Sequence, residues 1–224
     1  VVKLREALEA GRFGKLTLRT VRVRWARHQA YYDQDLWRGT WHMDGGVLTN
    51  QASHHVDMLE WMMGDVESVF AKITTALADV ETEDTAIVTL KFKNGALGII
   101  EATTATRPKN LEGSISILGE HGTVIVGGVA VNEMQTWVFE DEQEGDSSVL
   151  EEFSVNPPNV YGFGHQAYYE HVVDCIVNES ANLVDGLQGR KSIELISAIY
   201  ESAETGKEEF LKFQSKHCRL GRKN

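Results

Sequence analysis

The residues best suited to acid–base chemistry lie together in one predicted helix, over residues 47–63. Polar side chains recur there at spacings of 4, 3 and 4 residues: Asn50, His54, Asp57 and Trp61. At roughly 100° per residue they share one helix face, opposite an apolar stripe. The imidazole of His54 titrates near neutral pH and is our candidate for moving a proton, with Asp57, one turn along, orienting it. In the structural alternative, His54 and Asp57 only bond each other.

The approach to this helix favours a bound ligand. Gly45 and Gly46 allow a sharp turn before the helix N-terminus, where unpaired N–H groups favour acceptors and anions. The two glycines are therefore predicted to let another molecule, such as a cofactor, come close to the backbone. Residues 1–42 carry nine Lys or Arg against four Asp or Glu, which suits an anionic small ligand.

One arginine and one aromatic loop are candidates for contacting that ligand. Arg27 ends the apolar face of a strand predicted over residues 16–28, so it needs either a protein carboxylate or a ligand anion. The loop that follows suits the wall of a pocket, although the same side chains would suit a loop packed over the core. Its candidate residues are Tyr31, Tyr32, Trp37, Arg38 and Trp41.

The composition is that of a globular protein. The chain has 224 residues, 42% hydrophobic and 25% charged, without an apolar run long enough to span a membrane. Its net charge of −11 argues against nucleic acid or an anionic membrane as a partner. Cys175 and Cys218 form no paired motif, so a reducing cytoplasm is the expected location. Because the chain opens at Val1 rather than Met, we expect a piece of a longer protein.

Apolar periodicity predicts an α+β fold with one large, mostly antiparallel sheet and helices on one face. The strands after residue 66 read as an antiparallel meander, with a strong hairpin signal at Asn94-Gly95. Residues 1–224 show no domain boundary and are expected to form a single domain. The predicted helices cover 1–10, 47–63, 165–178 and 190–205, and further strands are predicted over 66–77, 114–118, 123–126, 132–139 and 208–213.

Motifs for nucleotides, zinc and hydrolysis are missing. No G-x-G-x-x-G follows a predicted strand and no P-loop pattern occurs, so no nucleotide-phosphate site is visible in this sequence. G-x-S-x-G, H-E-x-x-H and paired Cys-His spacings do not occur either.

The string DGGVLTNQASHHVDMLEWMMG, residues 44–64, resembles a family signature. It is similar to that of the C-terminal domain of the glucose-fructose oxidoreductase, inositol dehydrogenase and rhizopine-catabolism (Gfo/Idh/MocA) family. There a Gly-Gly turn opens a helix with a polar residue, followed by His four positions later and Asp three after that. Asn50, His54 and Asp57 occupy these positions, with Asn50 where many members have Asp. The resemblance extends to residues 184–207.

The resemblance implies the substrate-binding and oligomerisation half of a two-domain dehydrogenase. The other half of such proteins, an N-terminal Rossmann domain, binds NAD and supplies a Lys from an E-K-P motif. Neither is visible here, so the chain alone is expected to be inactive. His54 is then expected to take the proton as a secondary alcohol is oxidised, aided by Asp57, while Asn50 bonds a sugar hydroxyl or acetamido group.

Within the family, residues 24–55 and 161–172 look most like the WlbA/WbpB-type dehydrogenases, which oxidise C3 of UDP-N-acetyl-2-amino-2-deoxyglucuronate. Arg27 and Arg38 are then expected to bind a hexuronate carboxylate or a pyrophosphate. Tyr32 and Trp41 are expected to line the sugar or uracil. His165 is expected to contact the substrate, although a lone His at a helix start also suits a structural role.

Relatives assemble through the open sheet face, so a homodimer or homotetramer is expected. Two alternatives of other classes stay open. One is a metal-dependent sugar enzyme with His54, Asp57 and His165 as ligands, whereas the preferred interpretation assigns no metal. The other is a noncatalytic oligomeric or sugar-binding module without a cofactor.

Overall fold

The protein is described by a computed structural model that covers residues 1–128, 131–154, 164–182, 184–211 and 216–223. The helices are α1 (Val2–Glu9), α2 (Gln29–Tyr32), α3 (Val47–Asn50), α4 (Ser53–Met63), α5 (Val149–Glu152), α6 (Gly164–Val177) and α7 (Gly186–Thr205), with a 3₁₀ turn at Asp146–Ser148. The strands are β1 (Leu16–Arg24), β2 (Val66–Thr74), β3 (Thr85–Phe92), β4 (Leu97–Thr103), β5 (Glu112–Gly119), β6 (Gly122–Gly127), β7 (Glu133–Phe139) and β8 (Glu209–Phe210). None of the helices described is long and apolar enough to cross a membrane.

These strands form one sheet in the order β7-β6-β5-β1-β4-β3-β2-β8. The predicted large, mostly antiparallel sheet is confirmed, and the hairpin predicted at Asn94-Gly95 joins β3 to β4. The prediction of a simple meander is wrong, because β1 is inserted between β4 and β5. It runs parallel to β4 and antiparallel to β5, so Val21 pairs with Ile100 on one side and Ile115 on the other.

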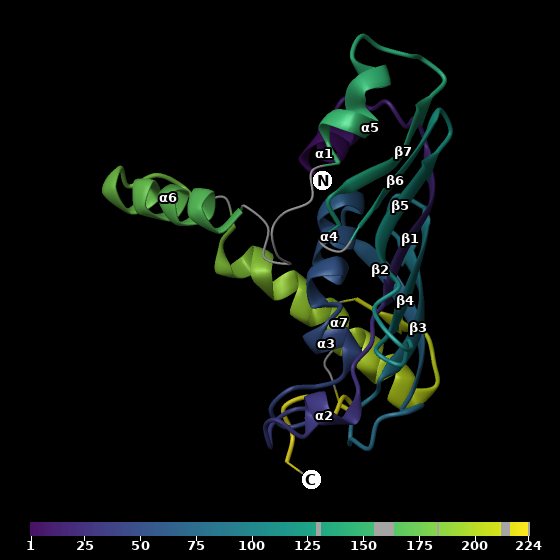
Figure 1. Cartoon of the computed structure of the whole chain (residues 1–224), viewed down its shortest axis with the longest axis vertical. Coiled ribbons are helices and arrows are strands. Elements are labelled where there is room, and N and C mark those ends of the chain that lie inside the picture. The colour runs from purple at the N-terminus through teal and green to yellow at the C-terminus, as the bar shows by residue number, and fades with distance from the viewer. Residues whose placement is uncertain (129–130, 155–163, 183, 212–215, 224) are drawn as a thin grey trace.

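Helices cover one face of the sheet, as predicted, and leave the other face open (Figure 1). Along β3 the buried side chains alternate with exposed ones, which is the pattern of a strand that packs on one side only. Val56 and Leu59 of α4 and Ile199 of α7 lie in the same buried core as Val88 and Ile100 of the sheet. The core therefore fixes α4, with the candidate His54, against the inner face of β1 and its neighbours.

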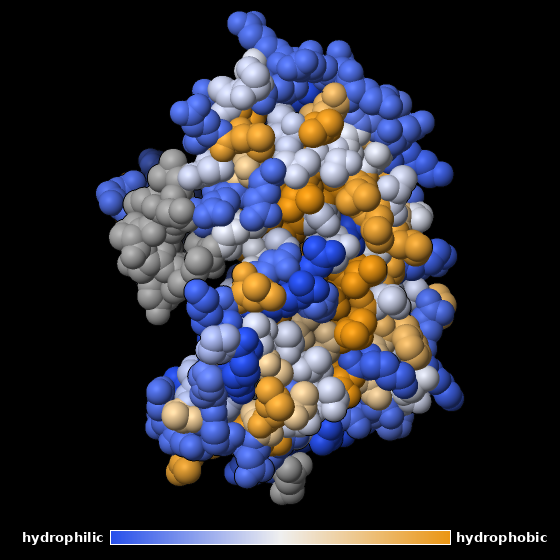
Figure 2. All heavy atoms as spheres, turned by 45° about the vertical axis from the view of Figure 1, so that its right-hand side comes forward, coloured by the Kyte–Doolittle hydropathy of each residue, from blue (hydrophilic) through white to orange (hydrophobic). Residues whose placement is uncertain are grey.

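The open face carries apolar side chains beside an ion-pair cluster. Phe70, Ile87 and Leu97 expose 37%, 56% and 55% of their surface, and Figure 2 shows hydrophobic surface gathered in a band on this side of the molecule. Arg24 projects from the same face and pairs with Glu101 at 2.6 Å. A monomer rarely exposes so much apolar surface on one face.

The helix predicted over residues 47–63 is divided in two. The backbone N–H of Ala52 donates to Val47 O at 2.8 Å, a bond that spans five residues instead of four. The chain therefore widens at this point, so that α3 ends at Asn50 and α4 begins at Ser53. Such a bulge turns the following residues about the helix axis. The single line of four polar side chains predicted on one helix face is broken after Asn50.

Boundaries elsewhere differ for local reasons. β1 ends at Arg24 rather than at residue 28, and beyond it an isolated bridge between Ala26 and Ala105 continues the pairing. α7 begins at Gly186, four residues early, because the side chain of Asp185 caps it by accepting a backbone N–H of the first turn. β8 covers only Glu209–Phe210. Residues 212–213 of the predicted last strand lie outside the described part of the chain.

Candidate functional site

His54 lies on the first turn of α4 against two other rings. Its ring centroid is 4.2 Å from that of His55 and 5.9 Å from that of Trp25. No side chain or backbone group in the described ranges hydrogen-bonds to its imidazole. Although His54 is an exposed residue, the protein packed around its ring partly removes water and lowers the pKa of His54. The imidazole is therefore neutral at neutral pH and ready to accept a proton.

Trp25 connects His54 to Arg27. The backbone N–H of Trp25 donates to Thr103 O at 2.9 Å, which holds this residue just beyond the end of β1. The guanidinium carbon of Arg27 lies 5.4 Å from the Trp25 ring and 5.2 Å from the Tyr31 ring. The structure thus brings two candidates that are far apart in the sequence, His54 and Arg27, against one indole ring.

The two candidate anion-binding arginines differ in their partners. Arg38 donates from Nε to Asp35 at 3.0 Å and from Nη1 to the Tyr31 hydroxyl at 2.7 Å. Arg27 donates to the carbonyl of Ala26 at 2.9 Å, and no Asp or Glu that the structure describes pairs with it. Because a half-buried cation needs a counter-charge, Arg27 is the better placed of the two for a ligand anion.

Hydrogen bonds tie Asn50 to the aromatic loop. Asn50 Nδ2 donates to Asp44 Oδ1, and Asn50 Oδ1 accepts from Gln51 Nε2 at 2.9 Å. Gln51 Nε2 also donates to the Tyr31 hydroxyl, at 3.4 Å. An amide has two N–H donors and two lone pairs, so these bonds leave one of each on Asn50 for a ligand.

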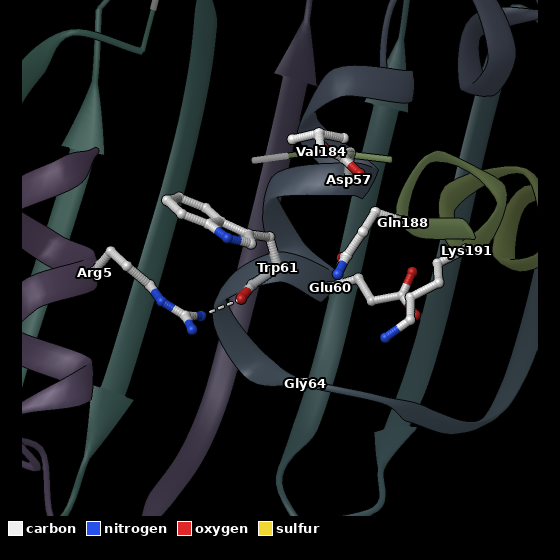
Figure 3. Close-up of a pocket in the computed structure, with 8 residues that line it drawn as sticks. All are labelled: Arg5, Asp57, Glu60, Trp61, Gly64, Val184, Gln188 and Lys191. Carbon is white, nitrogen blue, oxygen red and sulfur yellow. Dashed lines mark hydrogen bonds between the residues drawn. The ribbon is translucent and has the colours of Figure 1, made fainter. Parts of the chain in front are cut away.

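Asp57 and Trp61 line a different cavity, of about 400 Å³, between α4 and the beginning of α7 (Figure 3). Asp57 accepts from Ser192 Oγ at 2.5 Å, and no bond between Asp57 and His54 occurs in the described part of the chain. Arg5 of α1 donates to the Trp61 carbonyl at the other side of this cavity. The structure therefore gives Asp57 a partner on α7 in place of the predicted contact with His54.

The turn at Gly45 and Gly46 is filled by the protein itself. Gly45 has φ +76°, a conformation that glycine adopts without strain. A Cβ on Gly46 would overlap the carboxylate and the carbonyl oxygen of Glu83. Glu83 Oε1 in turn accepts from Leu48 N at 3.1 Å and from the Tyr200 hydroxyl at 2.8 Å. The group that approaches this backbone in the structure is therefore Glu83, so the predicted contact with a cofactor gains no support from this geometry.

Tyr32 and Trp41, predicted to line a ligand, are both buried in the structure. Tyr32 is 8% exposed, its hydroxyl bonds Thr104 Oγ1 at 2.9 Å, and burial raises its pKa. Trp41 is 1% exposed and packs edge-on against Tyr200 at 5.2 Å. The loop thus uses these two aromatic residues to cover the core, the alternative that the sequence left open.

His165 lies on α6, which projects away from the sheet and from α4 (Figure 1). The structure therefore does not bring His165 to His54. In the ranges described, no three His, Cys, Asp or Glu side chains are grouped so that they could hold a metal ion.

Sequence reasoning missed Trp25, Gln51 and His55 as parts of this site. Trp25 had one available signal, its position beside Arg27 at the end of a strand. Gln51 gains its role from the bulge that divides the helix, which periodicity does not reveal. His55 is fully buried and lies in α4 among apolar side chains, so the apolar pattern does not distinguish it from a core residue.

Comparison with known proteins finds one family. Residues 5–210 match the model described as "Oxidoreductase family, C-terminal alpha/beta domain". The WlbA dehydrogenase of Bordetella pertussis, solved with NADH and UDP-GlcNAcA, is 43% identical with a TM-score of 0.85, over 95% of this chain and 60% of that one. The WlbA dehydrogenase of Chromobacterium violaceum, solved with the same two ligands, is 45% identical with a TM-score of 0.86, over 95% and 59%.

A more distant relative points to the same family. The myo-inositol 2-dehydrogenase of Thermotoga maritima is 32% identical over 150 residues, which make up 64% of this chain and 41% of that protein. The chain spans about 60% of the length of the two solved WlbA relatives. It belongs to the Gfo/Idh/MocA oxidoreductase family, of which it is a C-terminal α/β domain.

Proposed function

We propose that this chain is the substrate-binding part of an NAD-dependent dehydrogenase that oxidises C3 of a UDP-N-acetyl-hexosaminuronate, UDP-GlcNAcA. The observation that carries the proposal is that one indole ring, Trp25, contacts both a neutral base, His54, and a cation with which no described carboxylate pairs, Arg27. The similarity to two WlbA dehydrogenases solved with NADH and UDP-GlcNAcA supports the substrate class.

His54 takes the proton in this proposal. Oxidation of a secondary alcohol removes a hydride from carbon and a proton from the hydroxyl, so a base must lie at that oxygen. The lowered pKa of His54 keeps its imidazole unprotonated at neutral pH, which is the form that accepts the proton. Asp57 remains the second catalytic residue predicted from the sequence, although its carboxylate accepts a hydrogen bond from Ser192.

Arg27 and Asn50 supply the binding groups. Arg27 has N–H donors free for the uronate carboxylate or the diphosphate, which a planar guanidinium binds through two oxygens at once. Asn50 has one donor and one acceptor left for a sugar hydroxyl or the acetamido group. Arg38, which is already paired with Asp35, has a lesser part in this scheme.

We propose that NAD binds to a part of the full-length protein outside the 224 residues of this chain. The Gly45–Gly46 turn does not fit a cofactor phosphate, because Glu83 fills it. The two WlbA relatives extend well beyond the part that matches this chain, and each was solved with NADH. The corresponding part of this protein is expected to hold NAD as the hydride acceptor.

The open sheet face is proposed to join copies of the protein into a homodimer or homotetramer. Phe70, Ile87 and Leu97 give this face an apolar centre, and the Arg24–Glu101 pair lies beside it. Light scattering of the full-length protein at micromolar concentration is expected to show the oligomer. A monomer under those conditions would contradict this assembly.

The proposed reaction is tested with the full-length protein. We expect NADH to appear when UDP-GlcNAcA and NAD are supplied, and His54→Gln to lower kcat by about 10²–10⁴-fold while NAD(H) still binds. His121→Gln is the matched control, because His121 is exposed and bonded to Glu140 at 2.9 Å, remote from the site. Oxidation of other sugars but not of UDP-GlcNAcA would contradict the proposed substrate. Full turnover by His54→Gln would contradict the role of His54 as the base.

A further inference from the structure

The exposed side of α4 carries three side chains in one line. His54, Asp57 and Trp61 are the exposed residues of this helix. Because His54 and Trp61 are seven residues apart, they lie on the same side of the helix, about 10.5 Å apart along its axis. Trp61 exposes 47% of its surface. A large aromatic ring is thus left uncovered on the side of α4 that presents the proposed base.

The Trp61 ring lies in a hollow between three helices. Together with Arg5 of α1, Val184 just before α7 and Lys191 of α7, it lines the cavity of about 400 Å³ (Figure 3). The guanidinium carbon of Arg5 lies 5.2 Å from the ring centroid, and Val184 exposes 49% of its surface. Tryptophan and arginine beside a pocket are the residues that most often carry the binding energy of a protein interface.

Charged side chains around the ring are already paired within the chain. Asp57 accepts from Ser192 Oγ at 2.5 Å, and Lys191 pairs with Asp65 at 3.3 Å. Such pairs do not require an ionic ligand, whereas the uncovered ring of Trp61 gains from contact with apolar groups. An apolar centre with paired polar groups around it is the composition of a surface on which another folded part packs.

The proposed reaction determines what must come close to this side of α4. A hydride passes from the sugar carbon to NAD only when the reacting atoms are about 3–3.5 Å apart, so the nicotinamide must reach the sugar carbon beside His54. The part of the full-length protein that binds NAD in the proposed function, here called the cofactor domain, must therefore approach the exposed side of this helix.

The size of such a domain extends its contact to Trp61. Trp25, with Arg27 against it, lies beside His54 on the first turn of α4, whereas Trp61 is on the last turn. A domain of about 100 residues has a radius of gyration of about 13 Å, which exceeds the separation of His54 and Trp61. The two WlbA relatives solved with NADH extend well beyond the part that matches this chain, which is enough for such a domain.

We propose that the surface around Trp61 is where the cofactor domain of the full-length protein packs, with a side chain of that domain in the cavity beside the ring. The inference rests on the proposed function and adds the contact that holds NAD over the substrate. Trp61 is then a positioning residue, because it acts through the cofactor domain and touches neither the sugar nor NAD.

Hydroxyl-radical footprinting of the full-length wild type, read by mass spectrometry, tests the contact without any substrate. We expect Trp61 to be protected relative to the unfolded protein, although half of its surface is exposed in this domain. Trp37, which is 39% exposed on the aromatic loop, is the matched control and should be labelled. Labelling of Trp61 to the extent of Trp37 would overturn the inference.

Trp61→Ala tests the role of the contact, and alanine keeps the helix because it is the best helix former. In the full-length protein kcat for UDP-GlcNAcA is expected to fall by about tenfold, because NAD is held over the substrate for a smaller fraction of the time. The Kd of NADH and the size of the oligomer should not change. Phe210→Ala, which removes another exposed aromatic ring, is the control and should keep the wild-type kcat.

Two outcomes of this experiment would contradict the inference. An unchanged kcat would show that Trp61 does not position the cofactor domain, and dissociation of the oligomer would show that a second copy of the protein covers the ring. If the wild type does not oxidise UDP-GlcNAcA, the proposed function is wrong. That failure is distinct from an active wild type in which Trp61 is labelled by hydroxyl radicals.

Discussion

Two buried glycines of this chain lie in regions of opposite character. A Cβ on Gly46, before α3, would overlap Glu83, whereas a Cβ on Gly113, on β5, would lie at ordinary contact distances of 3.5 to 3.7 Å from its neighbours. Beside Gly46, Glu83 Oε1 accepts from the Tyr200 hydroxyl at 2.8 Å, whereas the buried Glu83 Oε2 has no partner in the described residues. Around Gly113 the imidazole of His55 has no partner in the described residues.

The difference teaches that residue types alone do not show which glycine has room beside it and which is closely packed. The Gly45–Gly46 turn has the composition of a binding loop, yet Glu83 occupies the space beside Gly46. Trp25, His55 and Arg27 look ordinary in the sequence, yet each keeps donors or acceptors that the described protein does not satisfy.

The largest expected contrast is between the same substitution at the two glycines. The methyl group of Gly46→Ala would overlap side-chain and backbone atoms of Glu83. Because a change of rotamer does not move the backbone oxygen, the variant should lower the free energy of unfolding by more than about 3 kcal/mol. Gly113→Ala should stay within about 1 kcal/mol of the wild type. Denaturant unfolding followed by circular dichroism measures both, and equal stability of the two variants would break the comparison.

The next effect is the pH dependence of stability at Glu83. Burial raises its pKa from 4.5 to about 7, so the protonated form stabilises the fold fully below pH 4.5, and this contribution is lost as the pH rises to about 7. The loss amounts to about 3 kcal/mol. Glu83→Gln stays neutral, so the wild type should lose stability relative to it over this range. Parallel stability curves from urea unfolding at several pH values would show that Glu83 does not titrate in this way.

Alanine substitutions of Arg27 and Arg38 compare an arginine without a described counter-charge with one that is already paired. Arg27→Ala removes a cation without a described counter-charge and should raise KM for UDP-GlcNAcA by about 10- to 100-fold with little change in kcat. Arg38→Ala removes a cation already paired with Asp35 and should have a much smaller effect. Steady-state kinetics of the full-length protein measures both KM values. A larger increase in KM for Arg38→Ala than for Arg27→Ala would contradict the assignment of Arg27 as the main anion-binding residue.

The smallest effect is expected at a polar group that is fully paired inside the core. Tyr32→Phe removes the hydrogen bond to Thr104 and should lower the free energy of unfolding by about 1 kcal/mol, because the partner hydroxyl loses one bond. KM for UDP-GlcNAcA should not change. A raised KM for UDP-GlcNAcA at unchanged stability would indicate that Tyr32 contacts the substrate.

Much of the fold follows from local pattern, and the rest depends on contacts that pattern does not contain. Alternation predicts β3 and β4, and Asn94-Gly95 predicts their hairpin, because both signals are local. The insertion of β1 beside β4 joins segments about 80 residues apart, as in the pairing of Val21 with Ile100. Periodicity reveals which face of β1 is buried but not which strand lies beside it.

The site shows the same limit. His54 and Arg27 were predicted because an imidazole and an arginine at the end of an apolar face suggest chemistry by themselves. The contacts among His55, Trp25 and Gly113 were missed, because they form only where α4, the end of β1 and β5 meet. The break of the predicted helix near Ala52 was missed too, since a five-residue hydrogen bond leaves no mark on the apolar pattern.

The pH dependence of kcat/KM for UDP-GlcNAcA, compared between the full-length wild type and His54→Gln, tests His54 as the base. The wild type should lose activity toward acid pH as His54 becomes protonated, with an apparent pKa below the ordinary value for histidine, because burial disfavours the charged ring. The residual activity of His54→Gln should lack this acid limb. The same acid limb in the variant would contradict the assignment of His54 as the proton acceptor.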